Sequence, residues 1–366
     1  MKEQVLPPPG PPTIDCSYIE AARGRVAEMR AWKPETLDPP SVPELEAMLG
    51  QPITRCDSIG ENWRNRVYRI GLENGATALA KQVIMGTGEM LQYQHDQLLG
   101  LAKLNISGLR VPKPLGLMRE KRVLIMEFAR GETIQALVWN RRRERELMQA
   151  CELAGKILGQ IEIARTEKIG AMPVKELARD LAIARWSLTK RQQTLLSQAF
   201  ARLAGVNVRV GEVYYDYKPA NLIFADDQIS LIDPPDIFRR GVLLWDFACF
   251  RSSMRRHLWR LSLRWPDQRR RALIHQSLAG FERSYLSKVG QPYLEPALFA
   301  TALQLLELQR TAVLMTMQQG KVELAQLGRP IALGKRLGSS LANRLTLPLL
   351  EVEKHWLFRQ LARIRF

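Results

Sequence analysis

The sequence has 366 residues, of which 46% are hydrophobic and 25% are charged, so the chain can bury a sizeable core and form two lobes or domains. Lys and Arg outnumber Asp and Glu by 54 to 37, which gives a formal net charge of +17 and points either to an anionic partner or to an Arg-rich solvated surface. The four cysteines lie far apart with no metal-ligand or CxxC spacing, which excludes a disulfide-rich scaffold and a cysteine-based zinc site.

Residues 1–52 are rich in proline and predict an appended N-terminal arm with one helix. The candidate helix, residues 16–30, lies between the segments LPPPGPPT and KPETLDPPSVP, and prolines at that density prevent a continuous fold. The first residues, MKEQVLPPPGPPTID, carry acid and proline where a secretory signal carries a basic start and an apolar stretch. We therefore expect a cytoplasmic protein with free thiols.

Residues 53–130 predict a small lobe of antiparallel strands with one helix. The segments ITRCDSIG, RVYRIGLENG and TALAKQVI have the composition of three strands, with ENG as a turn. In GEMLQYQHDQLLGLAKLN the apolar residues recur at helical spacing, and RVLIMEFA predicts a further strand. A small sheet with one helix packed against it is expected.

Residues 131–366 predict a larger and mainly helical lobe. Only the stretch YYDYKPANLIFADDQISLIDPPD, residues 214–236, interrupts the helical pattern, as two short strands. The most apolar long segment, residues 297–317, contains Glu307 and Arg310, so it predicts a buried helix rather than a membrane span. Together the two regions predict an α+β, bilobal fold.

The interrupting stretch carries the residue types that phosphoryl transfer needs. Such a site holds metal ions against the phosphates and uses a carboxylate to orient the attacking hydroxyl and accept its proton. Asp216 is the candidate base, Asn221 the candidate amide ligand and Asp233 the candidate carboxylate ligand of Mg²⁺, which prefers such oxygen donors. The strands NLIF and ISLID, joined by ADDQ, would bring the two ligands to the same end of a hairpin. The alternative interpretation is that DYKPAN is an ordinary polar turn.

Taken in chain order, these pieces resemble the aminoglycoside phosphotransferase and choline kinase superfamily, whose fold is distantly related to that of protein kinases. The resemblance covers residues 53–248 and rests on the segments IGENWRNRVYRI, TALAKQV, VLIMEFARGETI, DYKPAN, ISLID and WDFACF. It implies a bilobal protein-kinase-like fold, an ATP-dependent kinase that acts on an alcohol group, and ATP and Mg²⁺ as cofactors.

The resemblance also assigns residues of a nucleotide site. Asn65 belongs to the turn that covers the nucleotide, Lys81 matches the third-strand lysine that contacts the phosphates, and the backbone of Glu127 and Phe128 would face the adenine. Lys218 either touches the transferred phosphate, as the lysine of protein kinases does, or remains a solvated surface charge.

Two positions depart from the family pattern. Tyr214 stands where relatives usually carry a mainly architectural His, so its ring must pack and its hydroxyl must find a partner. The acid that normally pairs with Lys81 has no clear equivalent, because the small-lobe helix offers four polar candidates, Glu89, Gln92, Gln94 and Asp96.

Two further acids follow the hairpin. Asp246 matches a structural aspartate that holds the catalytic loop from behind. Asp236, three residues after Asp233, is either a further metal ligand or a helix-capping acid.

Three functions are consistent with these features. The leading one is an ATP- and Mg²⁺-dependent kinase that phosphorylates a hydroxyl of a small molecule or a sugar-containing metabolite in the cytoplasm. The second is a kinase for a membrane glycolipid or a protein, and the third is a pseudokinase that senses nucleotide or acts as a scaffold.

Residues 239–271 motivate the membrane alternative. This run interleaves many arginines with Trp245, Trp259 and Trp265, a composition that suits an acidic lipid surface at the inner face of a membrane or an anionic glycoconjugate. Nucleic acid is a less favoured partner. The alternative is a large-lobe helix with a Trp core and solvated arginines.

Overall fold

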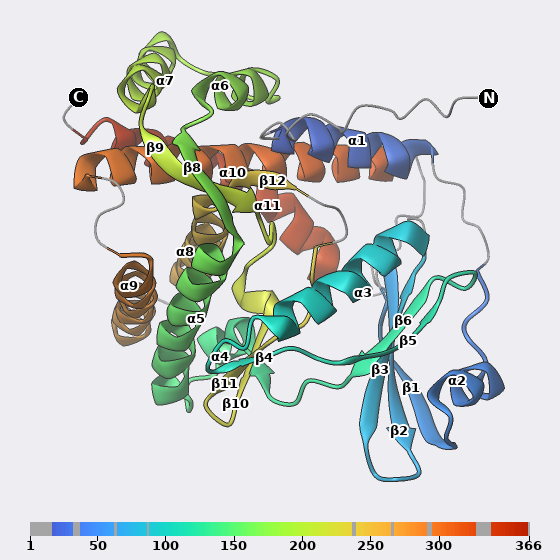
Figure 1. The fold of residues 1–366 in the computed structure, drawn as a ribbon. Helices are drawn as coiled ribbons and strands as arrows, with labels where there is room; N and C mark the ends of the chain where they lie inside the picture. Colours follow the sequence, from blue (N-terminus) through green and yellow to red (C-terminus); the bar gives the residue numbers. More distant parts are fainter. Residues whose placement is uncertain are drawn as a thin grey trace, which may run out of the picture.

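The smaller lobe is built on a five-stranded antiparallel sheet, as a computed structural model of the chain shows (Figure 1). Residues 17–31, 37–61, 64–85, 88–235, 239–264, 267–290, 295–326 and 338–364 are described. The sheet has the order β1-β2-β3-β6-β5, in which every neighbouring pair is antiparallel. Its strands are β1 (Ile53–Glu61), β2 (Asn65–Leu72), β3 (Thr77–Val83), β5 (Pro114–Met118) and β6 (Val123–Glu127).

A helix covers each face of this sheet, because successive side chains of a strand point to opposite sides. On β6, Val123 and Ile125 pack toward Leu45 of α2 (Val42–Leu49). Leu124 and Met126 pack on the opposite face against α3 (Gly88–Lys103). Within residues 53–130 the one predicted helix is α3, and α2 is supplied by the N-terminal residues. The small lobe also contains the strand β5, whose first residue, Pro114, suits an edge strand.

The N-terminal residues contain two helices, which corrects the expectation of an arm with one helix. Besides α2, the chain forms α1 (Tyr18–Ala31), which lies along α10 of the large lobe (Figure 1). Asp180 accepts hydrogen bonds of 3.0 Å from the backbone N–H of Ile19 and 3.2 Å from that of Glu20, so it caps α1 from a distant helix. Proline content predicted the interruptions but not this docking.

The larger lobe is mainly helical, as predicted. The helix that contains Gly155 crosses closely over the helix that contains Phe281. A Cβ at position 155 would lie 2.1 Å from the backbone oxygen of Phe281, so only glycine permits this contact. Thr189, with Gln192, forms a capping box at the start of another helix of this lobe. The helices are α4 (Ile134–Trp139), α5 (Glu144–Arg165), α6 (Val174–Ala182), α7 (Lys190–Leu203), α8 (Leu244–Arg264), α9 (Gln268–Val289), α10 (Pro296–Gln326) and α11 (Gly338–Leu361).

Two further sheets are built mainly from residues of the large lobe. The sequence predicted only one hairpin there, so the large lobe contains more strands than predicted. The predicted hairpin forms the centre of a four-stranded sheet, and three further strands form a separate sheet. The missed strands are two to six residues long, too short for a clear period. The strands are β4 (Leu109–Arg110), β7 (Glu132–Thr133), β10 (Leu222–Ala225) and β11 (Gln228–Leu231) in one sheet, and β8 (Thr166–Ala171), β9 (Asn207–Glu212) and β12 (Arg240–Val242) in the other.

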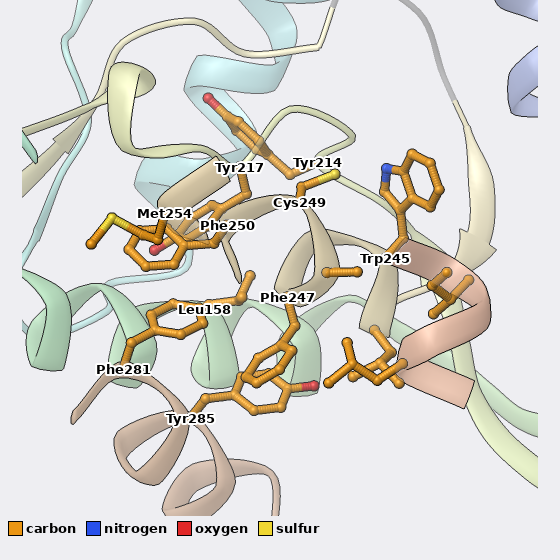
Figure 2. Close-up of a cluster of buried hydrophobic side chains, with 14 of the residues drawn as sticks. Leu158, Tyr214, Tyr217, Trp245, Phe247, Cys249, Phe250, Met254, Phe281 and Tyr285 are labelled. Atoms are coloured by element: carbon orange, nitrogen blue, oxygen red, sulfur yellow. The ribbon is translucent and has the colours of Figure 1, made fainter. Parts of the chain in front are cut away.

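An aromatic core supports the loop that follows β9. Figure 2 shows Tyr217 and Phe250 from this core, with Phe281 stacked on Phe250 at a centroid distance of 3.9 Å. Tyr217 donates a hydrogen bond of 2.8 Å to the carbonyl of Ala154, so the loop is tied to α5. The loop therefore rests on a rigid floor that α5, α8 and α9 provide.

The arginines and tryptophans of residues 239–271 lie largely inside the fold. Trp245 is fully buried, and Arg255 forms ion pairs of 3.1 Å with Glu307 and 3.0 Å with Glu353, whose side chains are completely buried. Trp245 and Arg255 are thus inside the fold, whereas Arg260 and Arg269 of the same run are exposed. Trp265 lies outside the described residues. No helix of the described chain has the length and apolar character needed to span a bilayer.

Candidate active site

The predicted hairpin forms and brings the two candidate metal ligands together. Leu222 pairs with Leu231, and the N–H of Ile232 donates a 3.2 Å hydrogen bond to the carbonyl of Asn221, so Asn221 and Asp233 flank the same end. At the other end, Asp226 and Asp227 both have positive φ angles, 49° and 54°, which suit a two-residue turn that matches the strand twist.

Lys81 lies beside Asp233 rather than beside an acid of α3. Its Nζ is 2.6 Å from Asp233 Oδ1 and 3.3 Å from Gln94 Oε1. Gln94 also donates a 3.0 Å hydrogen bond to the carbonyl of Pro234, so this buried amide joins α3 to the segment after β11. The residue that faces Lys81 from the helix is therefore Gln94. Because Gln94 is neutral, it does not compete with the charged Asp233 for the ammonium group of Lys81.

A cavity of about 440 Å³ lies between the lobes and contains most of the predicted nucleotide residues. Asn65, Lys81, Glu127 and Phe128 line it from the small lobe and the connection between lobes. Its other walls include apolar side chains, as a site for an adenine ring needs. The remaining wall residues include Ile59, Val67, Leu79, Met126, Ile223 and Ile232, together with Asn221 and Asp233.

Asp216 stands next to this cavity and is engaged by two cations. Lys218 is hydrogen-bonded to Asp216 Oδ2, and Arg310 of α10 donates a 3.0 Å hydrogen bond to Oδ1. Burial by itself would raise the pKa of Asp216, but the charges of Lys218 and Arg310 lower it to about 2. Asp216 is thus a carboxylate over the whole physiological pH range.

Lys218 was predicted as a nucleotide contact, but it is not part of the cavity wall. Its side chain pairs with Asp216 and is about one-third exposed. Lys218, which precedes Pro219, has an extended backbone conformation. Lys218 and the cavity-wall residue Asn221 both contact Oδ2 of Asp216, so Lys218 lies at the edge of the cavity without forming part of its wall.

The loop that presents Asp216 is held from behind. Asp246 accepts a 2.6 Å hydrogen bond from the N–H of Tyr214, and burial raises the pKa of Asp246 to about 7. Trp245 Nε1 donates a 3.2 Å hydrogen bond to the carbonyl of Tyr215, whose φ of 72° is unusual for a residue other than glycine. Asp246 therefore supports the loop from behind, as the sequence predicted.

Tyr214 fulfils half of what was expected of it. Its side chain is completely buried, and its ring stands edge-on to that of Tyr217 at 6.0 Å. Its hydroxyl has no hydrogen-bond partner within the described residues. The ring therefore fills the architectural position, while the hydroxyl does not replace the hydrogen bonds of a histidine.

The donor set at the hairpin fits Mg²⁺. Asn221 Nδ2 donates hydrogen bonds of 3.1 Å to the carbonyl and 3.3 Å to Oδ2 of Asp216, so its Oδ1 is turned away from that carboxylate. Asp233 is partly exposed to the same cavity. Within the described ranges no cluster of three or more His, Cys, Asp or Glu forms a metal site. Mg²⁺ does not need one, because it commonly takes one or two protein oxygens together with phosphates and water. Asp236 lies outside the described residues.

Two important residues were not singled out for the site from the sequence. Arg310 was used only as evidence against a membrane span, although an arginine within an otherwise apolar helix already signals a buried partner. Tyr18 gave no signal, yet its ring lies 4.0 Å from that of Trp245 and 5.6 Å from that of Tyr215. Helix α1 thus packs against the loop that carries Asp216.

Comparison with protein-family models assigns the chain. Residues 56–286 match the model described as the phosphotransferase enzyme family, which spans both lobes and every described residue of the site except Arg310 and α1. The chain belongs to this phosphotransferase family. A comparison with curated proteins gives no significant match.

Solved structures of other phosphotransferases share the fold. The amicoumacin kinase hAmiN, solved with AMP-PNP, Ca²⁺ and its ligand Ami, has 15% identity and a TM-score of 0.55, and the match covers 89% of this chain and 96% of that one. The aminoglycoside phosphotransferase APH(4)-Ia, solved with AMP-PNP and hygromycin B, has 14% identity and a TM-score of 0.54, with 88% and 99% covered. The predicted α+β, protein-kinase-like fold and the predicted family are both confirmed.

Proposed function

We propose that this phosphotransferase moves the γ-phosphoryl group of ATP, with Mg²⁺, to a hydroxyl of a small molecule or a sugar-containing metabolite. The observation that carries the proposal is the convergence of Asp216, Asn221, Asp233 and Lys81 at one end of the 440 Å³ interlobe cavity. Three of these groups come from residues 216–233 and Lys81 comes from the small lobe, and together they supply a carboxylate, two metal-type oxygen ligands and a cation.

On the nucleotide side, each residue has a separate proposed role. The apolar walls would hold the adenine against the backbone of Glu127 and Phe128, while Asn65 covers the phosphates from the β1–β2 turn. Lys81 would leave Asp233 and bind the phosphate oxygens. Asn221 and Asp233 would hold Mg²⁺, which would neutralise charge on the transferred phosphoryl group.

On the acceptor side, Asp216 would orient the attacking hydroxyl. A carboxylate with a pKa of about 2 is a weak base, so its main contribution is to position the hydroxyl and to accept the proton late in the transfer. Lys218, held on Asp216, is close enough to contact the transferred phosphoryl group as it approaches the acceptor. Asp236 stays a predicted further metal ligand.

The relatives support this proposal in a general way. Both hAmiN and APH(4)-Ia were solved with AMP-PNP. Each also held a second small molecule, Ami in hAmiN and hygromycin B in APH(4)-Ia. A small-molecule acceptor is therefore the natural expectation for this chain. The cytoplasm is the proposed location, since ATP is available there and the described cysteines are free thiols. Acidic membranes and nucleic acid stay untested predictions.

One observation favours a second candidate, a nucleotide-sensing module without transfer. Lys81 is paired with the candidate metal ligand Asp233, and its helix partner is the neutral Gln94. If this pairing persists with nucleotide bound, Asp233 would be less available to Mg²⁺. Such a protein would bind ATP but would not transfer its phosphate.

The test compares the wild-type protein with Asp216→Asn and Asp233→Ala. Purified protein is incubated with labelled ATP, Mg²⁺ and a metabolite extract, and transfer and nucleotide binding are measured separately. Both variants should lose transfer by at least a hundredfold. Asp216→Asn should still bind nucleotide, whereas Asp233→Ala should lose the Mg²⁺-dependent part of binding. Asp227→Asn, in the exposed turn of the same hairpin, is the matched control and should keep full activity.

The outcomes separate the two candidates. Transfer that depends on both aspartates supports the kinase. Nucleotide binding by the wild-type protein without transfer to any component of the extract would favour the sensing module. Transfer that survives Asp216→Asn would refute the assigned role of this carboxylate.

A further inference from the structure

One face of α1 points toward the loop that carries Asp216, and it contains an arginine. Tyr18, Ala22, Arg25 and Met29 recur at helical spacing, and the three apolar members of this set are buried. Arg25 shares their face, and its guanidinium lies 5.6 Å from the ring centroid of Tyr215, the residue before Asp216. A charged side chain thus occupies a position that the helix otherwise buries against the active-site loop.

A second arginine reaches the same region from the small lobe. The carbonyl of Arg64, in the β1–β2 turn, accepts a 2.7 Å hydrogen bond from the N–H of Ile84 and a 3.3 Å one from that of Met85. Met85 packs against Val26 and Met29 of α1, so Arg64 is held next to that helix. Burial, followed by the charge of Arg25, lowers the pKa of Arg64 to about 10, which is consistent with the closeness of the two guanidinium groups.

Helix α10 contributes two more cations along one face. Arg310, Met317 and Lys321 are spaced by seven and four residues, so they share a side of the helix. Arg310 contacts Asp216, and Met317 packs against the α1 and Met85 cluster. Lys321 shares the helix face of Arg310, and its pKa is lowered by burial and by the charge of Lys218.

The surroundings of Asp216 are therefore strongly cationic. Arg239 stacks over Tyr215 at 4.9 Å, which adds a sixth positive group from a further segment. Among the described residues, the carboxylates that act on Arg64 are Asp233, Glu28 of α1 and Asp216, and Asp246 lies behind the same loop at the N–H of Tyr214. We use the name cationic cluster for the six residues Arg25, Arg64, Lys218, Arg239, Arg310 and Lys321.

The cationic cluster lies outside the nucleotide cavity. None of its members belongs to the wall of the 440 Å³ cavity, where Lys81 is the cation. The cluster surrounds Asp216 from the side of α1 and α10, which is where an acceptor hydroxyl must approach if ATP fills the cavity. An acceptor with ammonium groups would be repelled there, whereas an anionic one would be attracted and could be bound by guanidinium hydrogen bonds.

We propose that the acceptor of this phosphotransferase carries an anionic group, a phosphate or a carboxylate, which the cationic cluster binds while Asp216 engages the hydroxyl. This inference rests on the proposed function. Its chemical class is a phosphorylated sugar or a sugar acid, and it separates this protein from phosphotransferases whose acceptors are amino sugars.

The first experiment uses a metabolite extract separated by ion exchange into anionic, neutral and cationic fractions. Each fraction is offered to the wild-type protein with labelled ATP and Mg²⁺. Transfer confined to the anionic fraction is expected, and phosphatase treatment of that fraction then separates phosphate esters from carboxylates. Transfer to the neutral or cationic fraction would overturn the inference and leave the proposed kinase function standing. If no fraction accepts phosphate, the proposed function fails, and the inference fails with it.

The second experiment assigns the anion to the cluster. With the anionic fraction or its purified acceptor, Arg25→Gln should raise the KM for the acceptor by roughly tenfold, because a hydrogen bond to a charged group is lost. The KM for ATP should stay unchanged, and Arg25→Lys should restore most of the loss. Arg23→Gln, which removes the same charge from the exposed face of α1, should have no effect.

Two results would overturn the assignment. Equal effects of Arg25→Gln and Arg23→Gln would mean that only the overall charge matters. A rise in the KM for ATP alone would place Arg25 at the nucleotide. Melting temperatures of the variants exclude a simple loss of folding, and Arg64→Gln provides an independent variant from the other lobe.

Discussion

The two sides of Asp216 differ in composition and in origin. The nucleotide side is an apolar cavity with one cation, Lys81, and it is formed by adjacent strands and by the β10–β11 hairpin. The opposite side is surrounded by the cationic cluster, whose members come from α1, two loops of the large lobe, the β1–β2 turn and α10. ATP, a cofactor that many enzymes share, would thus bind at a site formed by neighbouring strands and one hairpin. The proposed acceptor side is assembled from segments that lie far apart in the chain.

The largest expected effect is on the acceptor side, where α1 docks. Tyr18→Ala removes a fully buried ring that contacts Trp245 and Tyr215, so the free energy of unfolding should fall by about 4 kcal/mol. Urea unfolding followed by tryptophan fluorescence measures this change. Arg23→Ala, on the exposed face of the same helix, should change it by less than about 0.5 kcal/mol. Equal, small effects of the two substitutions would show that α1 is not an integral part of the fold.

On the nucleotide side, Lys81→Ala should reduce kcat/KM for ATP by about a hundredfold or more, because a cation aimed at the phosphates is removed. Steady-state kinetics with varied ATP measures the loss. Lys103→Ala, an exposed lysine at the end of α3, is the control and should match the wild type. Unchanged kinetics for Lys81→Ala would contradict the role of the cavity.

Arg310→Gln tests how the acceptor side holds its carboxylate. At pH 8 the activity should fall by roughly tenfold, since a charge-assisted hydrogen bond is lost. The pKa of Asp216 should rise, because burial is then opposed by Lys218 alone. A carboxylate is protonated as the pH falls through its pKa, so the acid limb of the pH profile should move to higher pH. Arg310→Lys should return the acid limb to its wild-type pH. If the acid limb of Arg310→Gln lies at the same pH as that of the wild type, Arg310 does not set the charge of Asp216.

The smallest effect is expected for Gln94→Glu. A carboxylate at this buried position would attract Lys81 away from Asp233 and should lower the KM for MgATP by only roughly threefold, because the desolvation of a buried ion pair offsets most of its attraction. Gln92→Glu places the same charge on the same helix away from Lys81 and is the matched control. A tenfold loss of kcat/KM in Gln94→Glu would instead mean that the hydrogen bond from Gln94 to Pro234 is the more important contact.

The nucleotide side could be predicted residue by residue because its signals are local. The alternation of apolar residues around ADDQ predicted the hairpin, and the hairpin by itself brings Asn221 and Asp233 together. Lys81 was placed correctly in the third strand, yet its neighbour Gln94 could not be chosen. Residues 92, 94 and 96 lie within about one turn of α3 and point in different directions around its axis. The sequence does not tell which of these directions faces Lys81.

The sequence by itself determined the α+β fold, the order of the two lobes, the family and the hairpin with its oxygen ligands, because each depends on periodicity or on residues close together in the chain. Only the tertiary structure decided that α1 packs against Tyr215 of the active-site loop, that Arg310 contacts Asp216 and that Arg255 of α8 pairs with a buried glutamate. These contacts join residues separated by tens to hundreds of positions. Side-chain burial and charge pairing select them, and neither leaves a periodic trace in the sequence.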